Sequence, residues 1–285
     1  MIYSRAKISY YFEIGKYRHK NLDDAAYLNI KVQKFRINLP RKPYLCPPKH
    51  YATRFMQTKN IQITISEDIL CVCPDFRFAT VECEVKNTPY NEALWQEIDA
   101  FCSSFREIVK MDEINKRPAI FATRQAYKKL GKDPNRYRPS AEALCRRIVK
   151  GEKLYQIDTL VDIINLVSIQ TGYSIGGFDA DKIKGNLVLG IGKADEPFEA
   201  IGRGMLNIEG LPVYRDEIGG IGTPTSDEER TKITSETSRL LMIINGYSGE
   251  KGLQEAVDLT LELLGKYLAK IPVQTNFKHY SSYLT

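Results

Sequence analysis

The sequence predicts an α+β or mixed α/β fold, in which mixed sheets and flanking helices form a single core behind a poorly structured N-terminal leader. Several segments place apolar residues at the spacing of a buried helix face, and others are short β-branched runs bounded by Gly, Pro and Asp. These segments do not alternate regularly between strand and helix, so a doubly wound parallel sheet is not expected.

The first elements after the leader are expected to be strands, because β-branched and alternating apolar residues are typical of them; they are IQITI, DILCVC and FATVECEV, residues 61–65, 68–73 and 78–85. A helix should follow from about Pro89, since apolar residues recur there at helical spacing: Leu94, Trp95, Ile98, Cys102, Phe105 and Ile108. The stretch 124–153 is predicted to be helical, with Ser140 as a helix N-cap.

Another helix is expected from Asp158 to Gly172, with the glycine as its stop. The chain then turns to strands separated by Gly, Pro and Asp turns: GNLVLGIG, PFEAIG, LPVYRD and RLLMIING, residues 185–192, 197–202, 211–216 and 239–246. A final amphipathic helix from about Gly252 to Leu268 completes the predicted core. The tail, residues 271–285, is expected to be loose.

The composition, with 43% hydrophobic and 27% charged residues in 285, is that of a globular protein and not of a disordered, collagenous or disulfide-scaffold chain. No stretch approaches the roughly 20 apolar residues of a membrane helix, and the first residues are too polar for a signal peptide. A cytoplasmic protein is therefore expected. The six cysteines have neither CxxC redox nor zinc spacing, which favours reduced, mostly buried thiols.

The leader, residues 1–55, carries twelve Lys and Arg against three Asp and Glu, whereas the rest of the chain is slightly acidic. One interpretation is a basic arm for nucleic acid. The other, which we favour, is that Met56 is the true start, so that the folded domain is 56–270. A protein beginning at Met56 should then keep the melting temperature of the full chain; a drop of several degrees would contradict this, because 1 kcal/mol shifts Tm by about 2–4 °C.

The three histidines are His19, His50 and His279, so none lies where the folded core is expected. A His-based triad, a Cys–His pair and a His-ligated zinc are therefore not expected, and the sequence has no GxxxxGK[ST] phosphate loop or strand-linked GxGxxG. We expect no metal and no cofactor. Carboxylates, amides, hydroxyls and glycine backbone remain, and such a set suits binding or the cleavage of a labile bond.

Three clusters carry candidate site residues, each with a structural alternative. VDIINLVSI places Asp162 and Asn165 on one face of the predicted helix, where they line a site or form a polar edge. In DEIGGIGTPTSDEERT, residues 216–231, three glycine N–H groups can bind an anion or an oxyanion. The structural alternative is that this segment is a flexible hairpin tip. Residues 116–153 hold twelve Lys and Arg against three acids, which indicates phosphate contacts or a solvated helix surface.

The run LYQIDTLVDIINLVSIQTGYSIGGFDADKIKGNLVL resembles the editing domain of bacterial phenylalanyl-tRNA synthetase β subunits, in which a VD[IV]TN helix precedes a HAFD loop, DKI and a strand. The flanking YKKLGKDPNRYRPSAEALCRRI and LPVYRDEIGGIGTPTSDEERTKIT are more similar to free-standing relatives of that domain. The similarity covers about Phe76 to Leu268. It implies the family fold and the family role, which is hydrolysis of the ester between a wrong amino acid and the terminal ribose of tRNA.

By this resemblance, Asp162 and Asn165 correspond to the Asp and Asn of VDITN, and Asp179 to the Asp of HAFD. Gly176 stands where the family has the His of HAFD, which implies open space there, and Gly219 and Gly220 correspond to the glycine pair of its AGIMGG loop. The Glu of the following strand has no counterpart. Because that His and Glu help to recognise mischarged tyrosine, tyrosine specificity is not implied.

We therefore predict a trans-acting aminoacyl-tRNA deacylase for a mischarged tRNA, including one that bears a non-cognate or non-protein amino acid. Asn165 and the Gly220 backbone would act at the ester, so that Gly220→Val would abolish hydrolysis with little loss of fold. Asp216 or Asp227 would receive the substrate's ammonium, which favours a cationic or strongly hydrogen-bonding amino acid. Further substrate-binding candidates are Asp162, Gly176, Asp179, Gly219, Gly222 and Thr223.

The expected partner is tRNA, with no membrane association. Its backbone would be contacted by six basic residues: Lys128, Lys129, Lys132, Arg136, Arg146 and Arg147. Arg138 and Glu142 are set apart, since opposite charges four residues apart can pair at a helix entry. Two alternatives remain: a non-catalytic tRNA- or RNA-binding module, and a small-molecule-binding regulatory protein.

Overall fold

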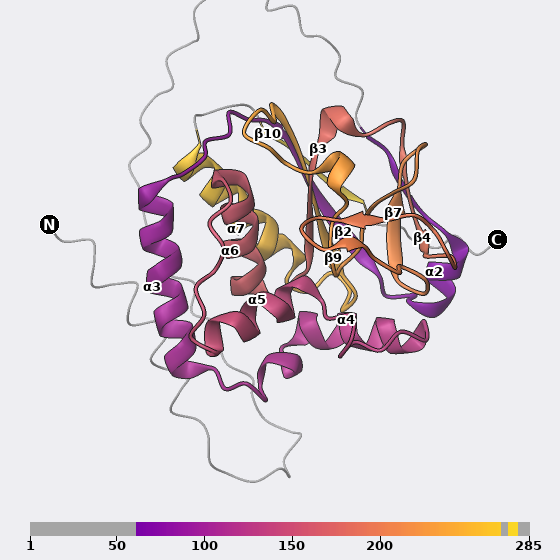
Figure 1. The fold of residues 1–285 in the computed structure, drawn as a ribbon, viewed down its shortest axis with the longest axis horizontal. Helices are drawn as coiled ribbons and strands as arrows, with labels where there is room; N and C mark the ends of the chain where they lie inside the picture. The colour runs from indigo at the N-terminus through magenta and orange to yellow at the C-terminus, as the bar shows by residue number, and fades with distance from the viewer. Residues whose placement is uncertain (1–60, 269–272, 279–285) are drawn as a thin grey trace, which may run out of the picture. The chain divides into compact units, whose positions relative to one another are not determined.

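The fold is given by a computed structural model that describes residues 61–268 and 273–278. The predicted leader lies outside these residues, as does Cys46. Helices and sheets are mixed in the described part, which confirms the predicted fold class (Figure 1).

The larger part of the core rests on a four-stranded antiparallel sheet. Its order is β10-β2-β9-β3, and the strands are β10 (Val273–Lys278), β2 (Arg77–Glu84), β9 (Arg239–Gly246) and β3 (Ile175–Asp179). Strand β3 therefore lies at an edge of this sheet, which we call the central sheet. Strand β10 corrects the prediction of a loose tail for residues 273–278, since the backbone pairs there with β2, and the rest of the predicted tail lies outside the described residues.

A second four-stranded sheet has the order β1-β4-β7-β8 and one parallel pair, β1 with β4. Its strands are β1 (Ile63–Ile65), β4 (Leu187–Ile191), β7 (Pro212–Arg215) and β8 (Gly220–Gly222). A small hairpin joins β5 (Glu199–Ala200) to β6 (Gly204–Met205).

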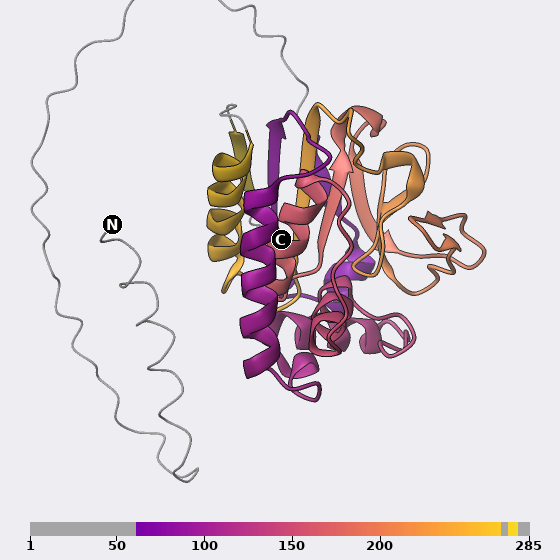
Figure 2. The ribbon, with the colours of Figure 1, turned by 60° about the vertical axis from the view of Figure 1, so that its left-hand side comes forward.

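The helices are α2 (Glu67–Val72), α3 (Glu92–Ile108), α4 (Pro118–Lys129), α5 (Ser140–Val149), α6 (Thr159–Thr171) and α7 (Leu253–Tyr267). In Figure 2, α3, α6 and α7 lie on one side of the central sheet and the orange strands of the second sheet on the other. None of the described helices is both long and apolar enough to span a membrane.

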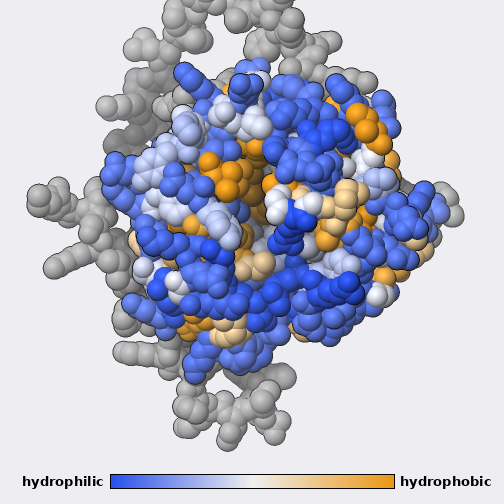
Figure 3. Space-filling model, viewed as in Figure 1, coloured by the Kyte–Doolittle hydropathy of each residue, from blue (hydrophilic) through white to orange (hydrophobic). Residues whose placement is uncertain are grey.

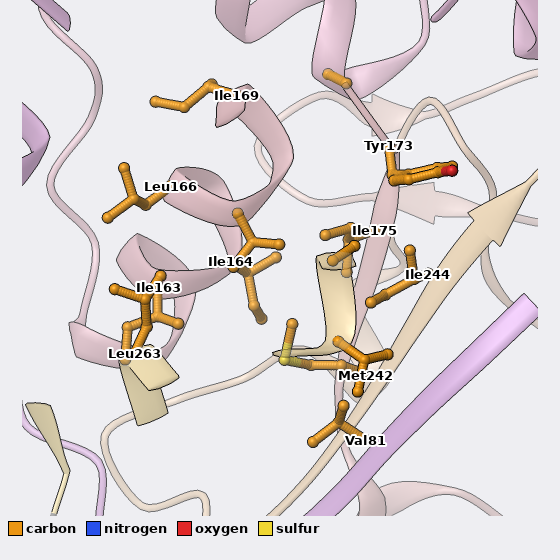
Figure 4. Packing of buried hydrophobic residues seen from close by; sticks show 14 of the residues in the cluster. Val81, Ile163, Ile164, Leu166, Ile169, Tyr173, Ile175, Met242, Ile244 and Leu263 are labelled. Carbon is orange, nitrogen blue, oxygen red and sulfur yellow. The ribbon is translucent and has the colours of Figure 1, made fainter. Parts of the chain in front are cut away.

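Alternation along the strands of the central sheet divides the core into two clusters. On one face, Val81, Met242 and Ile244 pack with Ile163 of α6 and Leu263 of α7 (Figure 4). On the other face the central sheet packs against the second sheet through a different set of side chains, among them Phe78, Phe178, Ile243, Leu189 and Tyr214. The described part of the chain therefore has three stacked layers, with the central sheet between a layer of helices and the second sheet.

Most of the predicted elements are confirmed, but two predictions in the described residues are wrong, one of an element's type and one of a helix cap. DILCVC lies in helix α2 rather than in a strand, since the two acids of its first turn, Glu67 and Asp68, favour a helix start. Helix α5 begins at Ser140, so Pro139 and not Ser140 is its N-cap. Helix α6 has the predicted caps: the Asp158 side chain accepts from the Val161 N–H, and Gly172 is left-handed with φ of 86°.

The cysteine prediction is confirmed for the five described cysteines, which are all free. Four of them are buried and Cys71 is exposed. Burial raises the pKa of the Cys83 thiol to about 12, with a further contribution from the neighbouring Glu82 charge. The buried thiols are therefore inert packing groups rather than nucleophiles.

Candidate functional site

A pocket of about 380 Å³ lies between helix α6 and the edge of the central sheet. Val161, Ile164, Asn165 and Ser168 line it from α6 at positions i, i+3, i+4 and i+7, which is one face of the helix. The remaining walls are supplied by Ser140, Leu144, Ile157, Ile175, Gly177, Ile201, Thr223, Ser226, Asp227, Lys232 and Ile233. Figure 3 shows a face of the molecule that is hollowed near its middle, with hydrophobic side chains inside and hydrophilic ones around.

The loop that follows β8 is fixed beside this pocket by hydrogen bonds to α5, to the β5–β6 hairpin and within itself. The Ser140 N–H, at the start of α5, donates to the Pro224 carbonyl at 2.8 Å. The Ile201 N–H, at the tip of the β5–β6 hairpin, donates to the Asp227 carbonyl at 3.0 Å. The Thr223 hydroxyl donates to the Ser226 carbonyl at 3.1 Å, which closes the turn between them.

Asp227 is the acidic residue of the pocket wall. Because β3 is an edge strand, its outward N–H at Gly177 is available, and it donates to Asp227 Oδ2 at 3.1 Å. Asp227 makes no ion pair with any other residue of the described ranges. Burial raises the pKa of this carboxyl to about 7, against the lowering effect of the Gly177 hydrogen bond. An unpaired carboxylate in a largely apolar wall favours a cation as its missing partner.

Three glycines near Asp227 occupy positions where a side chain would meet its neighbours. A Cβ at Gly222 would lie 2.7 Å from Asp227 Oδ1, and a Cβ at Gly177 would lie 2.4 Å from Ile164 Cδ1. A Cβ at Gly176 would lie 2.7 Å from the Phe178 ring. The expectation of open space at Gly176 is therefore wrong, because Phe178 fills it. By strand alternation it is Gly177, one residue further, that lines the pocket.

Asn165 lies at the junction of two hollows. It lines the pocket and also a neighbouring groove of about 410 Å³, which shares Ser140 and Leu144 with the pocket. Its side-chain amide makes no hydrogen bond within residues 61–268 and 273–278. Two N–H donors and a carbonyl acceptor are therefore available to a ligand that spans both hollows.

Asp162 does not share the Asn165 face, which corrects the prediction from the sequence. Its Oδ2 accepts from the Trp95 indole at 2.6 Å and its Oδ1 from the Ile157 N–H at 3.2 Å, so the side chain points toward α3. Burial raises the pKa of Asp162 to about 6, and these two hydrogen bonds oppose the rise. Asp162 lines neither hollow and fixes α6 against its neighbours.

Asp179 and Asp216 also lie outside the pocket. Asp179 ends β3, where its carboxylate accepts from the Thr237 hydroxyl at 3.0 Å and pairs with Lys182 at 3.5 Å. The Asp216 carboxylate is held by the Arg230 guanidinium at 2.9 and 3.0 Å and by backbone N–H groups, including that of Gly219. Burial alone would raise its pKa, but these partners hold it below the ordinary value. Of the two acids predicted to receive the substrate's ammonium, only Asp227 lines the pocket.

The glycine loop is a paired strand rather than an open anion cradle. Gly220 and Gly222 belong to β8, where they pair with Arg215 and Tyr214 of β7. Neither Gly219 nor Gly220 lines the pocket, whereas Thr223, just beyond β8, does. A role for the Gly220 N–H as an oxyanion donor is therefore not supported by its position.

Gly220→Val is expected to destabilise the fold, contrary to the expectation from the sequence. A Cβ at Gly220 would lie 2.9 Å from the buried Phe198 ring, and such overpacking costs about 1–3 kcal/mol. Thermal unfolding should show a Tm several degrees below the parent, with Gly219→Ala as the control, because a Cβ at Gly219 meets nothing within 4 Å. A Gly220→Val protein with parental Tm and no hydrolysis would instead restore the catalytic role.

The six basic candidates divide into two groups. Arg146 and Arg147 of α5 line the groove, and Arg146 Nε donates to Glu142 Oε1 at 2.8 Å. The other four line neither hollow: Lys128, Lys129, Lys132 and Arg136. The Lys132 ammonium lies 4.1 Å from the Tyr137 ring centroid, so Lys132 packs locally. Lys128, Lys129 and Arg136 are exposed. The predicted Arg138–Glu142 pair is confirmed at 3.7 Å.

Sequence reasoning missed several residues of the two hollows. Gly177 could have been found, since strand alternation separates it from Gly176. Ile201, Arg203 and Lys232 carry no local signal, because tertiary packing of the β5–β6 hairpin and of the segment before β9 brings them to α6. Lys232 also forms an ion pair with Glu229, so it is not a free cation facing Asp227.

Comparison with known proteins shows what part of this chain is similar to other proteins. Residues 122–262 match the B3/4 domain family. The phenylalanine–tRNA ligase β subunit of Bartonella henselae is 29% identical, over 42% of this chain and 19% of its own length. A solved N-terminal fragment of the phenylalanyl-tRNA synthetase β subunit from Pyrococcus horikoshii is similar with a TM-score of 0.39 and 16% identity, covering 73% of this chain and 49% of the fragment.

The chain therefore contains a domain similar to the B3/4 domain of phenylalanyl-tRNA ligase β subunits, which confirms the resemblance seen in the sequence. It spans about a fifth of the length of the ligase subunit that it matches. The matched residues begin in α4 and end in α7, and they include every residue that lines the pocket or the groove.

Proposed function

We propose that this protein is an aminoacyl-tRNA deacylase that acts in trans on a mischarged tRNA. The observation that carries the proposal is the position of Asn165, between an apolar pocket with one unpaired carboxylate and a groove lined with cations. An aminoacyl-tRNA has the complementary parts in the same order, an amino acid, an ester and a polyanion. The ligase β subunit to which the domain is similar is named for its action on tRNA.

In this proposal the amino acid lies in the pocket and the ester lies at Asn165. The ester is already activated, so a water held against its carbonyl carbon in the right orientation supplies much of the acceleration. The Asn165 amide N–H donates to the carbonyl oxygen and stabilises the oxyanion that develops there. The hydroxyls of Ser140 and Ser226, which line the pocket, are candidates to position that water.

The pocket wall favours an amino acid with an apolar stem and a cationic group. Isoleucine, leucine and valine side chains make up much of the lining, and the Asp227 carboxylate is its unpaired charge. Either the α-ammonium or a cationic side chain would provide the counter-ion that Asp227 lacks. The groove side of Asn165 would take the tRNA backbone through Arg146 and Arg147, with exposed Lys128, Lys129 and Arg136 as contacts further away.

A deacylation assay with a panel of mischarged tRNAs tests the proposal. We expect release of free amino acid from at least one ester, with cationic amino acids released fastest. Tight tRNA binding without release from any ester would favour the non-catalytic RNA-binding module. Binding of free amino acid without binding of tRNA would favour a small-molecule-binding regulatory protein.

Asp227→Asn should raise KM for a cationic substrate by about 10–100-fold, because a hydrogen bond to a charged group contributes about 1.5–3 kcal/mol. In the parent the folded pKa of about 7 lies above the ordinary carboxyl value of 3.8. The protonated carboxyl therefore stabilises the fold at low pH, and this contribution is lost as pH rises toward 7. Thermal unfolding should show that the Tm of the variant rises relative to that of the parent as pH increases from 4 to 7. Above pH 7 the difference between the two Tm values should stay constant.

Asp216→Asn is the matched control for this prediction. It removes a carboxylate that is paired with Arg230 and bound by backbone N–H groups, so Tm should fall while KM stays at the parental value. A parental KM in Asp227→Asn, or a raised KM in Asp216→Asn, would show that the ammonium site has been assigned to the wrong acid.

A further inference from the structure

Residues 151–157, between α5 and α6, form one side of the pocket mouth, and we call this segment the strap. It contains neither helix nor strand. Ile157 lines the pocket and is nevertheless 56% exposed, so it lies at the rim of the pocket rather than deep in its wall. The position of the strap therefore affects how open the pocket is to solvent.

Few hydrogen bonds hold the strap in place. Within the described ranges, the backbone groups of residues 153–157 make no hydrogen bond to another backbone group. Near one end, the Arg147 guanidinium donates to the Lys153 carbonyl. At the other end, the Ile157 N–H donates to Asp162 Oδ1 at 3.2 Å. Two charged side chains therefore hold the strap, and Asp162 is the one that holds its pocket end.

The Asp162 carboxylate is itself firmly placed. The residue lies in the first turn of α6 and is 1% exposed, and its Oδ2 accepts from the Trp95 indole N–H at 2.6 Å. Trp95 belongs to α3 and packs against the core. The start of α6 is fixed as well, since the Thr159 N–H donates to the Thr88 carbonyl at 2.9 Å. The carboxylate therefore connects the rim of the pocket to the helical layer.

We infer that Asp162 is a positioning residue, which holds Ile157 at the pocket mouth and so limits the access of water and ligands to the pocket. This inference rests on the proposed function, in which the pocket holds the amino acid, and deepens it. An amino acid with an apolar stem would contact the Ile157 side chain, and the strap would open for its entry and release. Asp162 thus acts on the pocket although it lines neither hollow.

Labelling of a cysteine introduced into the pocket measures this access without any substrate. Ser226→Cys places a thiol in the pocket wall, and mass spectrometry follows the reaction of each cysteine with iodoacetamide. Adding Asp162→Ala should speed labelling of the introduced thiol about tenfold, because the loss of a hydrogen bond to a charged group shifts a local opening equilibrium by about that factor or more. The exposed Cys71 is the internal reference, and its labelling rate should not change.

Trp95→Phe is the matched control, because it removes the other hydrogen bond of the same carboxylate and leaves the Ile157 N–H with its acceptor. Both variants should have a lower Tm than the parent. Only Asp162→Ala should speed labelling, and it should also speed trypsin cleavage after the exposed Lys153 of the strap. Asp162→Leu, which has a similar shape and no acceptor, gives the same test if the alanine variant does not fold.

Ile157→Ala tests the rim directly. It truncates a side chain that is more than half exposed and leaves the Asp162 carboxylate with both of its donors, so Tm should change little. Labelling of the introduced thiol should nevertheless be faster than in the parent, because the apolar cover of the mouth is smaller. A parental labelling rate in this variant would show that Ile157 does not limit access.

Parental rates of labelling and cleavage in the folded Asp162 variant, or an equal acceleration in Trp95→Phe, would overturn the inference. The deacylation panel separates this from failure of the proposed function, because labelling needs no substrate. If the parent hydrolyses an ester, Asp162→Ala alone should raise KM about tenfold and leave kcat within about twofold, since the rim contacts the amino acid and not the ester. If the parent hydrolyses none, faster labelling retains the positioning role and only the catalytic proposal is lost.

Discussion

Asn165→Ala should lower the rate of ester hydrolysis by about 10²–10³-fold while leaving tRNA affinity within about twofold. Removal of one donor to a developing oxyanion typically costs about 2.7–4 kcal/mol of transition-state stabilisation. Asn165 makes no hydrogen bond within the described ranges, so its truncation breaks no structural contact of that kind. Single-turnover deacylation and a separate binding measurement with uncharged tRNA give the two quantities.

Two further variants show whether the amide itself is responsible. Asn165→Asp keeps the shape but removes the N–H donors, so it should be as slow as the alanine variant. Ser168→Ala changes a neighbouring pocket residue whose hydroxyl already donates to the Tyr173 carbonyl at 2.7 Å, so it should retain hydrolysis. Hydrolysis at the parental rate in both Asn165 variants would place the ester elsewhere.

Glu142→Ala should strongly destabilise the fold, with a loss of about 3–5 kcal/mol in the free energy of unfolding. The Glu142 side chain is fully buried and binds Arg124, which is itself 10% exposed, so its removal leaves a buried guanidinium without its counter-charge. We expect Tm to fall by about 10 °C, measured by calorimetry or circular dichroism.

Glu152→Ala provides the contrast, because the Arg147–Glu152 pair is partly exposed at the surface and surface ion pairs contribute about 0–1 kcal/mol. A small change in Tm for both glutamate variants would show that the Arg124–Glu142 pair contributes little to stability. Glu142→Gln keeps the volume and part of the hydrogen bonding, so its Tm should lie between those of the parent and of the alanine variant.

The periodic parts of the fold could be predicted from sequence, whereas glycine-rich and short strands could not. Helices α3, α6 and α7 repeat apolar residues over several turns, and α6 also has its caps in the sequence. Strand β8 consists of Gly220, Ile221 and Gly222, so it lacks the side-chain pattern of a strand and resembles a loop. What makes it a strand is its pairing with β7 and the close approach of Phe178 and Phe198, which are remote in sequence.

The candidate site shows the same limit. Asp216 and Asp227 flank the glycine stretch on its two sides, and the sequence pattern does not show which of them faces a pocket. What separates them is Arg230, which folds back onto Asp216, and the edge of β3, which offers the Gly177 N–H to Asp227. Asn165 could be predicted because the helical period of the apolar residues shows which face of α6 it lies on. Asp162 could not, because its side chain binds Trp95, a partner 67 residues earlier in the sequence.

The strand order of the central sheet determines how the chain can fold as it is synthesised. Val81 of β2 pairs with Met242 of β9, and β3 joins the sheet through β9 alone. Such non-local pairing gives a high contact order, so sheet closure should be slow compared with formation of helices α3 to α6. Until residues 239–246 leave the ribosome, β2 and β3 have no strand between them and their apolar faces stay uncovered. The nascent chain is therefore most exposed to aggregation and to chaperones during synthesis of the segment that carries Asn165 and Asp227.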